Sequence, residues 1–196
     1  MKTAALTRSA ILQAARSQLL DQGFAGMSTR KVAEAAQVPL SQLHYHFGSK
    51  RQLILTLLED ENQRRLARQR RLYTQEIPLW KEYEQACDYL EDDLDSGYVR
   101  ILQEMIAAGW SDPEIGAATR QLLKGWFDLL TEVAREAERL HGPLGPFTAE
   151  ETATLIGNMF MGAEALLLLG FDRAQLPIRS ALRRISLLIR GFEEQQ

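Results

Sequence analysis

The stretch QVPLSQLHYHFGSK, residues 37–50, decides the fold, because it places a short helix directly between two turns. Pro39 disfavours helical geometry in the residue before it, so residues 37–39 are expected to form a tight turn. The eight residues LSQLHYHF, at 40–47, then predict a short helix, which Gly48 ends.

The residues on the N-terminal side complete a unit of three helices. A first helix is predicted from about Thr7 to Gln22, with apolar residues at three- and four-residue spacing, and Gly23 ends it. Ser28 is a good N-cap for a second short helix over TRKVAEAA. Three short helices with a tight turn between the second and third indicate a helix-turn-helix domain, whose third helix enters the DNA major groove.

Charge separates this segment from the rest of the chain. Residues 1–71 hold 12 Lys and Arg against 5 Asp and Glu, a net charge of +7, whereas residues 72–196 hold 11 against 21, a net charge of −10. A basic module joined to an acidic one predicts that only the first third of the chain meets a polyanion.

Composition excludes several other classes of protein. With 45% hydrophobic and 25% charged residues, the chain is expected to be soluble and globular. Cys87 is the only cysteine, which excludes an internal disulfide and a multi-thiolate metal site. The N-terminus lacks a secretory pattern. The most apolar run, residues 155–170, is too short to span a bilayer, which takes about 20 apolar residues. We expect a cytoplasmic protein without cofactor.

His44 and His46 raise the question of a metal site. Two residues apart on a helix, their side chains point about 200° away from each other and cannot ligate one metal together. Leu43 and Phe47 share the inward face of the predicted helix, and the histidines flank the outward face, from which they could reach phosphates. That outward face, placed to meet base edges, consists of Ser41, Gln42 and Tyr45.

The rest of the chain is also helical, with no alternating run that predicts a strand. The fold class is therefore all-α, with a three-helix N-terminal domain and a larger helical C-terminal part. Further helices are predicted at about 50–72 after a Ser49–Gln52 capping box, from Pro78 to Gly97, from Pro113 to about Leu140, from Thr148 to Leu169 after a Thr148–Glu151 capping box, and at about 178–190.

Residues 11–59 resemble the DNA-binding domain of the tetracycline-repressor (TetR) family of bacterial regulators. The matching elements are Gly23-Phe24, Ser28-Thr29, the run VAEAAQV at 32–38 and, above all, HFGSK at 46–50. The resemblance implies a DNA-binding domain at 1–50 and a helical regulatory, ligand-binding and dimerisation domain at 51–196. It also implies a homodimer that binds a palindromic double-stranded operator and responds to a small-molecule effector.

The same resemblance implies individual DNA contacts. Ser41 would lie against bases, His44, Tyr45 and His46 against the backbone, and Lys50 against a phosphate near a helix N-terminus. The family usually has Tyr at position 44 and Ser or Thr at position 39, so a hydroxyl is lost at Pro39 and the charge of His44 depends on pH. Alternatively, Tyr45 and His46 merely cover the surface of a short helix. The predicted DNA-contacting residues are Ser28, Thr29, Arg30, Leu40, Ser41, Gln42, His44, Tyr45, His46 and Lys50.

A second basic run, RRLARQRR at 64–71, also suggests DNA binding. Arg64 lies about 22 Å along the predicted helix from Ser49, which places the run beyond the duplex if that helix leads away from it. Pairing with the acidic run EDDLD at 91–95 is the favoured interpretation.

The C-terminal helices carry the expected dimer and effector sites. The helix over 148–169 is apolar nearly all round and would be buried on two sides, by the core and by a partner subunit, with Ala153, Gly157 and Gly162 allowing close approach. The alternative is an ordinary core helix in a monomer. The predicted dimer-interface residues are Met161, Ala165, Leu168, Leu169, Ile185 and Leu188.

Aromatic and methionine side chains are the candidates for an effector pocket, although such residues at helical spacing are more often plain core. Glu104, Asn158 and Glu164 are polar residues in apolar surroundings that could orient a ligand. The predicted pocket residues are Tyr98, Met105, Trp126, Phe127, Met159 and Phe160.

Three functional hypotheses follow. The leading one is a dimeric, ligand-responsive transcriptional regulator, most often a repressor in this family, released from its operator by a small molecule. An enzyme is disfavoured, because the sequence contains no phosphate-binding glycine loop, metal-ligand helix motif or nucleophile elbow, and no catalytic residue is predicted. The third is a helical ligand-sequestering or interaction protein with weak, non-specific DNA binding.

Overall fold

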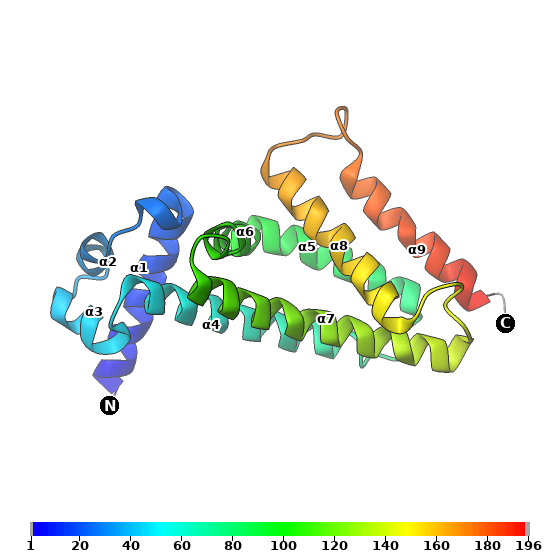
Figure 1. The fold of residues 1–196 in the computed structure, drawn as a ribbon, viewed down its shortest axis with the longest axis horizontal. Coiled ribbons are helices and arrows are strands. Elements are labelled where there is room, and N and C mark those ends of the chain that lie inside the picture. The colour runs from blue at the N-terminus through cyan, green and yellow to red at the C-terminus, as the bar shows by residue number, and fades with distance from the viewer. Residues whose placement is uncertain (1, 195–196) are drawn as a thin grey trace. The chain divides into compact units, whose positions relative to one another are not determined.

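The computed structural model describes residues 2–194, and these residues form helices joined by turns and loops (Figure 1). The prediction of an all-α fold with an N-terminal helix-turn-helix unit is confirmed. Within the described range the helices are α1 (Lys2–Gly26), α2 (Thr29–Ala35), α3 (Leu40–Phe47), α4 (Lys50–Leu72), α5 (Leu79–Asp95), α6 (Tyr98–Gly109), α7 (Pro113–His141), α8 (Ala149–Leu168) and α9 (Ile178–Glu194).

Capping chemistry explains why most of these boundaries agree with the sequence. Ser28 Oγ accepts a hydrogen bond of 3.2 Å from the Lys31 backbone N–H at the start of α2. Thr148 and Glu151 form both halves of a capping box at the start of α8. Gly48 follows α3 with a φ of 71°, in the left-handed region that glycine adopts without strain.

Two features differ from the predicted pattern. Gly23 has a φ of 67° and a ψ of 174°, which are not helical values, so α1 is kinked at this residue before it ends at Gly26. The helix α6 was not singled out from the sequence, although residues 98–109 have a strongly amphipathic pattern. The kink and α6 are linked by a hydrogen bond between Glu104 of α6 and the backbone of Phe24, which is described below.

The chain divides into two compact units. One consists of residues up to 64 together with 100–122, and the other of residues 65–99 together with 123 onwards. Helices α4, α6 and α7 therefore contribute residues to both units. The predicted functional boundary between a DNA-binding domain at 1–50 and a regulatory domain at 51–196 does not coincide with this structural division. It stays a prediction.

In the first unit, α1, α2 and α3 pack against one another (Figure 1). Their shared core contains fully buried residues from each helix, among them Leu19 of α1, Val32 of α2 and Leu43 of α3. This core fixes the orientation of α3, because burying Leu43 and Phe47 turns the opposite face of the helix outward.

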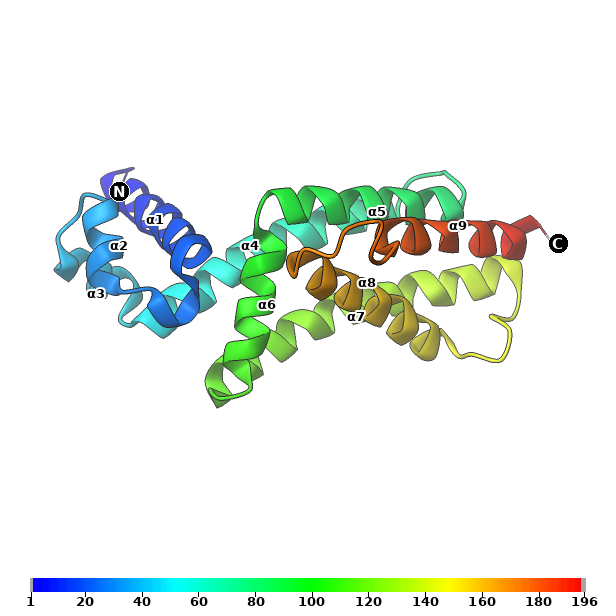
Figure 2. The same ribbon diagram turned by 90° about the horizontal axis from the view of Figure 1, so that it is seen from above.

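In the second unit, α9 lies alongside α5, and α8 packs against both (Figure 2). Tyr83 is central to the core: its hydroxyl donates a hydrogen bond of 3.0 Å to the Leu182 carbonyl, and its ring meets that of Phe160 edge-on at 5.8 Å. The three helices thus share one hydrophobic cluster, which leaves other faces of α8 and α9 exposed.

Candidate nucleic-acid interface and ligand cavity

Helix α3 presents a polar and aromatic face that the core does not use. Ser41, Gln42 and His44 are exposed, and Tyr45 is 80% exposed. An aromatic ring this exposed contributes little to folding, and aromatic side chains are enriched where a surface meets a partner. These residues therefore lie together on one outward face of α3, as the helical period of the sequence predicted.

The first turn of α3 and the helix before it are held by local contacts. Gln37 has a φ of 56° in the tight turn, and Pro39 precedes α3 without any side-chain capping hydrogen bond, as expected from the missing hydroxyl. Ser28 uses its hydroxyl as the N-cap of α2, Thr29 is half-buried and Arg30 is exposed. Unlike Ser28 and Thr29, the Arg30 side chain can therefore extend into solvent and reach a phosphate.

His44 binds the end of its own helix. Its Nδ1 donates a hydrogen bond of 2.8 Å to the Gly48 carbonyl oxygen. A neutral imidazole has one N–H, so Nε2 can only accept in that state, and only the protonated ring leaves an N–H available to a phosphate. The neighbouring ring of His46 is half-buried and meets Tyr45 edge-on at 5.2 Å.

Lys50 lies at the start of α4 and contacts the chain after the kink in α1. Its Nζ is 3.4 Å from the Ala25 carbonyl oxygen and 4.6 Å from the centre of the Phe24 ring. Partial burial lowers the pKa of this amine. An ammonium group has three N–H donors, so a phosphate contact remains geometrically open to the donors that Ala25 does not use.

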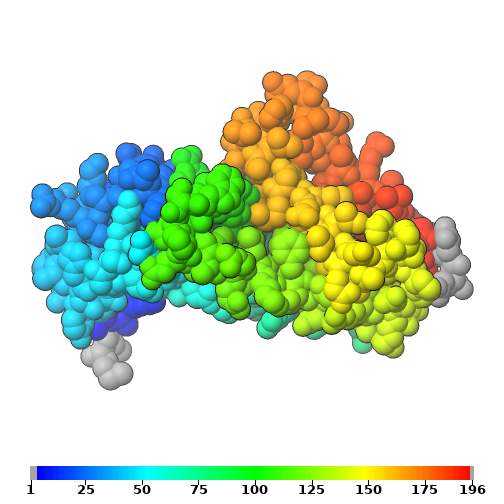
Figure 3. All heavy atoms as spheres, in the orientation of Figure 1, coloured from blue at the N-terminus to red at the C-terminus, as the bar shows by residue number. Residues whose placement is uncertain are grey.

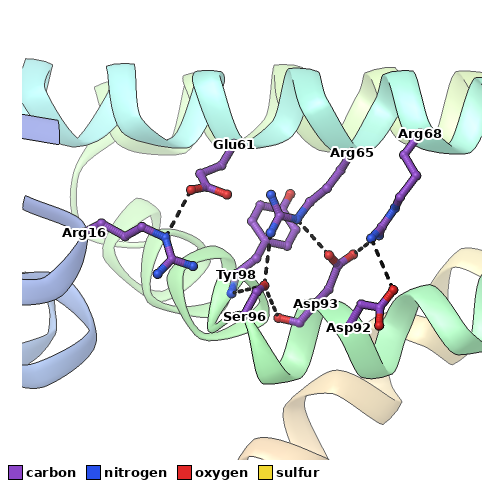
Figure 4. Close-up of polar contacts among 8 residues, drawn as sticks. All are labelled: Arg16, Glu61, Arg65, Arg68, Asp92, Asp93, Ser96 and Tyr98. Carbon is purple, nitrogen blue, oxygen red and sulfur yellow. Dashed lines mark hydrogen bonds and ion pairs between the residues drawn. The ribbon is translucent and has the colours of Figure 1, made fainter. Parts of the chain in front are cut away.

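Within the second unit, the basic run of α4 pairs with the acidic run of α5 (Figure 4). Asp93 accepts hydrogen bonds from Arg65 at 2.9 Å and from Arg68 at 2.7 Å, and Asp92 lies 3.8 Å from Arg68. Burial raises the pKa of Asp93, and the two guanidinium groups oppose that shift. Arg65 and Arg68 therefore pair with residues 91–95 as predicted, and the expectation that the run at 64–71 does not contact DNA stays a prediction.

The predicted pocket residues are distributed over both units. Met105 is fully buried in the first unit, whereas the other five belong to the second. Trp126 meets Phe160 edge-on at 6.4 Å, and the Tyr98 ring lies under the Arg65 guanidinium at 3.8 Å. The structure therefore does not gather all six around one cavity, and their role in ligand binding stays a prediction.

A large cavity lies elsewhere in the second unit, between α7, α8, α9 and the start of α5. Its volume is about 500 Å³, within the range of small-molecule sites. Of the six predicted pocket residues only Met159 lines it; the rest of the wall includes Tyr73, Leu144, Phe147 and Phe192. No pattern in the sequence distinguishes these residues from ordinary core.

A second cavity of about 380 Å³ in the same unit is bounded by α5, the start of α9 and the loop before it. Two of its arginines pair with carboxylates of α5: Arg179 with Glu91 at 2.8 Å, and Arg183 with Asp88 at 2.5 Å. Cys87 also lines it, and burial raises the pKa of this thiol to about 11. The thiol is therefore protonated and unreactive near neutral pH.

The predicted dimer residues lie on the outer side of the second unit. Leu168, Leu169 and Leu188 are exposed, and Met161, Ala165 and Ile185 are half-buried. The loop between α8 and α9 projects from the surface of this unit (Figure 3). By contrast, Ala153 and Gly157 are buried inside the subunit, so the expectation that they face a partner is corrected.

Among residues 2–194, no three His, Cys, Asp or Glu side chains gather in a way that could hold a metal ion. No helix in this range is long and apolar enough to cross a membrane.

Comparisons with known proteins agree with this geometry. Residues 11–57 match the family model described as bacterial regulatory proteins, tetR family. The HTH-type transcriptional regulator UidR of Escherichia coli (strain K12) is 25% identical over an alignment of 146 residues, with 71% of this chain and 70% of that protein covered.

Solved structures extend the similarity in fold to nearly the whole chain. Salmonella enterica GusR has a TM-score of 0.76 at 18% identity, with 96% of this chain and 95% of that chain covered. FadR from Bacillus subtilis, solved in complex with stearoyl-CoA, has a TM-score of 0.72 at 14% identity, with 96% and 98% covered. A TetR-family regulator from Agrobacterium tumefaciens has a TM-score of 0.78 at 18% identity, with 96% and 98% covered.

Proposed function

Because this chain belongs to the TetR family of bacterial regulators, we propose that it is a cytoplasmic homodimer that binds a palindromic operator through α3. A small molecule bound in the C-terminal half would release the dimer from the operator, which makes a repressor the favoured form. The observation that carries the proposal is the exposed face of α3, where Ser41, Gln42 and Tyr45 have no role in the core.

Charge and symmetry support this proposal. The net charge of +7 over residues 1–71 suits a polyanion, and the duplex is neutralised mainly by Lys and Arg. A palindrome needs two reading heads related by a twofold axis, and the exposed leucines of α8 and α9 supply an apolar surface for self-association. The small-molecule response is supported by FadR from Bacillus subtilis, which was solved with stearoyl-CoA.

Selection of bound duplexes from a random-sequence DNA pool at moderate salt tests the proposal. Enrichment of an inverted repeat with half-site centres a whole number of helical turns apart is the expected result. A Tyr45→Ala variant should lose most of the enrichment. The control is Glu34→Ala, a substitution at an exposed position outside the α3 face, and it should keep the enrichment. Binding without any enriched sequence would favour the alternative, a helical ligand-sequestering or interaction protein with weak, non-specific DNA binding.

A further inference from the structure

The cavity between α7, α8 and α9 has no ionised group in its wall. Every lining residue is aliphatic or aromatic, apart from Thr152 and the thioether Met159, and the two tyrosines are the only titratable side chains among them. Burial raises the pKa of Tyr73 and of Tyr83, so both phenols are neutral at physiological pH. A ligand charge buried here would lose its hydration without gaining a partner, which is strongly unfavourable.

One polar atom of the wall lacks a partner. Thr152 lines the cavity, and its Oγ1 is buried without a hydrogen-bond partner among the described residues. Tyr83 differs, because its hydroxyl already donates to the Leu182 carbonyl. An unpaired buried hydroxyl is costly, and a ligand carrying one hydrogen-bonding group would relieve that cost.

The mouth of the cavity opens on the surface where self-association is predicted. Leu155 is 48% exposed and Leu188 70% exposed, although both line the cavity. Ile185 and Leu188 also belong to the predicted dimer surface. An apolar opening flanked by exposed leucines is the kind of surface that a second subunit covers.

We propose that this cavity is the effector site, that it takes an uncharged, largely apolar molecule with one or two hydrogen-bonding groups, and that a second copy of the chain closes its mouth. The inference rests on the proposed function for the effector role and for the dimer. It goes beyond that function by assigning the site, the ligand class and the contribution of the partner. Ile185 and Leu188 line the cavity and also belong to the predicted dimer surface. Binding of a ligand in the cavity therefore changes the affinity of the two subunits for each other.

The ligand class is tested with the full-length chain and the uncharged dye Nile red. Octane-1,8-diol and octanedioate, which have the same length and differ in charge at both ends, then compete for the dye. The diol should displace it at a concentration at least about tenfold lower than the dianion, because one carboxylate would have to be buried. Equal or better displacement by octanedioate would overturn the ligand class.

Two variants locate the site. Thr152→Val preserves shape and removes the hydroxyl, so the diol should bind about three- to tenfold more weakly. Thr154→Val is the matched control, because Thr154 lies on the same helix, is exposed and donates to the Glu150 carbonyl. Ala137→Phe should fill the cavity and abolish dye binding. If this variant does not fold, the comparison of Thr152→Val with Thr154→Val is sufficient to test the location of the site. Unchanged diol affinity in Thr152→Val would show that the ligand binds elsewhere.

The remaining measurements separate this inference from the proposed function. Saturating diol should change the dimer dissociation constant by about fivefold or more, and an unchanged constant would refute the coupling. DNA binding is measured on the same samples. Specific DNA binding without dye binding would refute the site and leave the regulator intact. Dye binding without specific DNA binding would refute the regulator and, with it, the effector role of the site.

Discussion

The Glu104 carboxylate accepts a hydrogen bond of 3.1 Å from the Phe24 backbone N–H, so α6 holds the segment directly after the kink in α1. The kink residue Gly23 lies against the same carboxylate: a Cβ at this position would stand 3.0 Å from Glu104 Oε1. Glu104 was a candidate for orienting a ligand. In the structure it accepts a hydrogen bond from a backbone N–H at the kink instead.

Removing that carboxylate should destabilise the first unit. Glu104→Ala leaves the Phe24 N–H unpaired, and the free energy of unfolding should fall by about 1–3 kcal/mol. Glu104→Gln retains an acceptor and should lose less than half as much. Urea unfolding followed by circular dichroism measures both. Equal losses in the two variants would mean that charge, and not the acceptor, is what matters at this position.

Two glycines of α8 should respond oppositely to alanine. A Cβ on Gly157 would lie 2.2 Å from Phe127 Cε1, so Gly157→Ala forces that ring to move and should cost about 1–3 kcal/mol of stability. A Cβ on Gly162 meets nothing within 4 Å in the subunit, so Gly162→Ala should gain up to about 1 kcal/mol in the monomer, where no partner packs against this position. Thermal unfolding at one protein concentration compares them. A neutral Gly157→Ala would show that Phe127 repacks freely.

A buried carboxyl should make stability depend on pH. Burial, with a contribution from the Glu193 charge, raises the pKa of Glu82 from 4.5 to about 7. Glu193 itself accepts hydrogen bonds from the Leu79 and Trp80 N–H groups and lies 3.8 Å from His141 Nε2.

Between pH 4.5 and 7 the unfolded chain has therefore lost a proton from Glu82 that the folded chain keeps, so the free energy of unfolding falls as pH rises through this window. Glu82→Gln removes that loss and should be about 2 kcal/mol more stable than the wild type at pH 8, and similar at pH 4. Denaturant unfolding from pH 4 to 8 measures the difference. The control Glu76→Gln, at an exposed carboxyl, should follow the wild type. A difference independent of pH would contradict the expected protonation.

Self-association should be sensitive to charge at an exposed leucine that lines neither cavity. Leu169 is 75% exposed in the subunit, so Leu169→Glu should leave the folded monomer intact and raise the dimer dissociation constant at least about tenfold. Leu140→Glu, at a 55% exposed position at the end of α7, is the control and should leave the constant unchanged. Sedimentation velocity over a concentration series measures both. Wild-type association of Leu169→Glu would place the dimer contact elsewhere.

Most of the helix boundaries and the outward face of α3 could be predicted from the sequence, because they depend on neighbours along the chain. Ser28 caps α2 through a residue three positions away, and Thr148 and Glu151 cap α8 in the same way. The helical period turns Tyr45 outward once Leu43 is buried. The proposed recognition surface for DNA thus depends on residues that are close together in the sequence.

The cavity and the contact of Glu104 with Phe24 were decided by tertiary structure alone. Glu104 is distant in sequence from Phe24, and its partner follows from the packing of α6 against the end of α1. The cavity wall combines Tyr73, Phe147 and Phe192 with residues of α7 and α8, and no periodicity distinguishes these side chains from ordinary core. Some apolar residues pack into a core and others leave a cavity, depending on how well the shapes of segments distant in sequence fit together. The pattern of residue types along the chain does not contain this information.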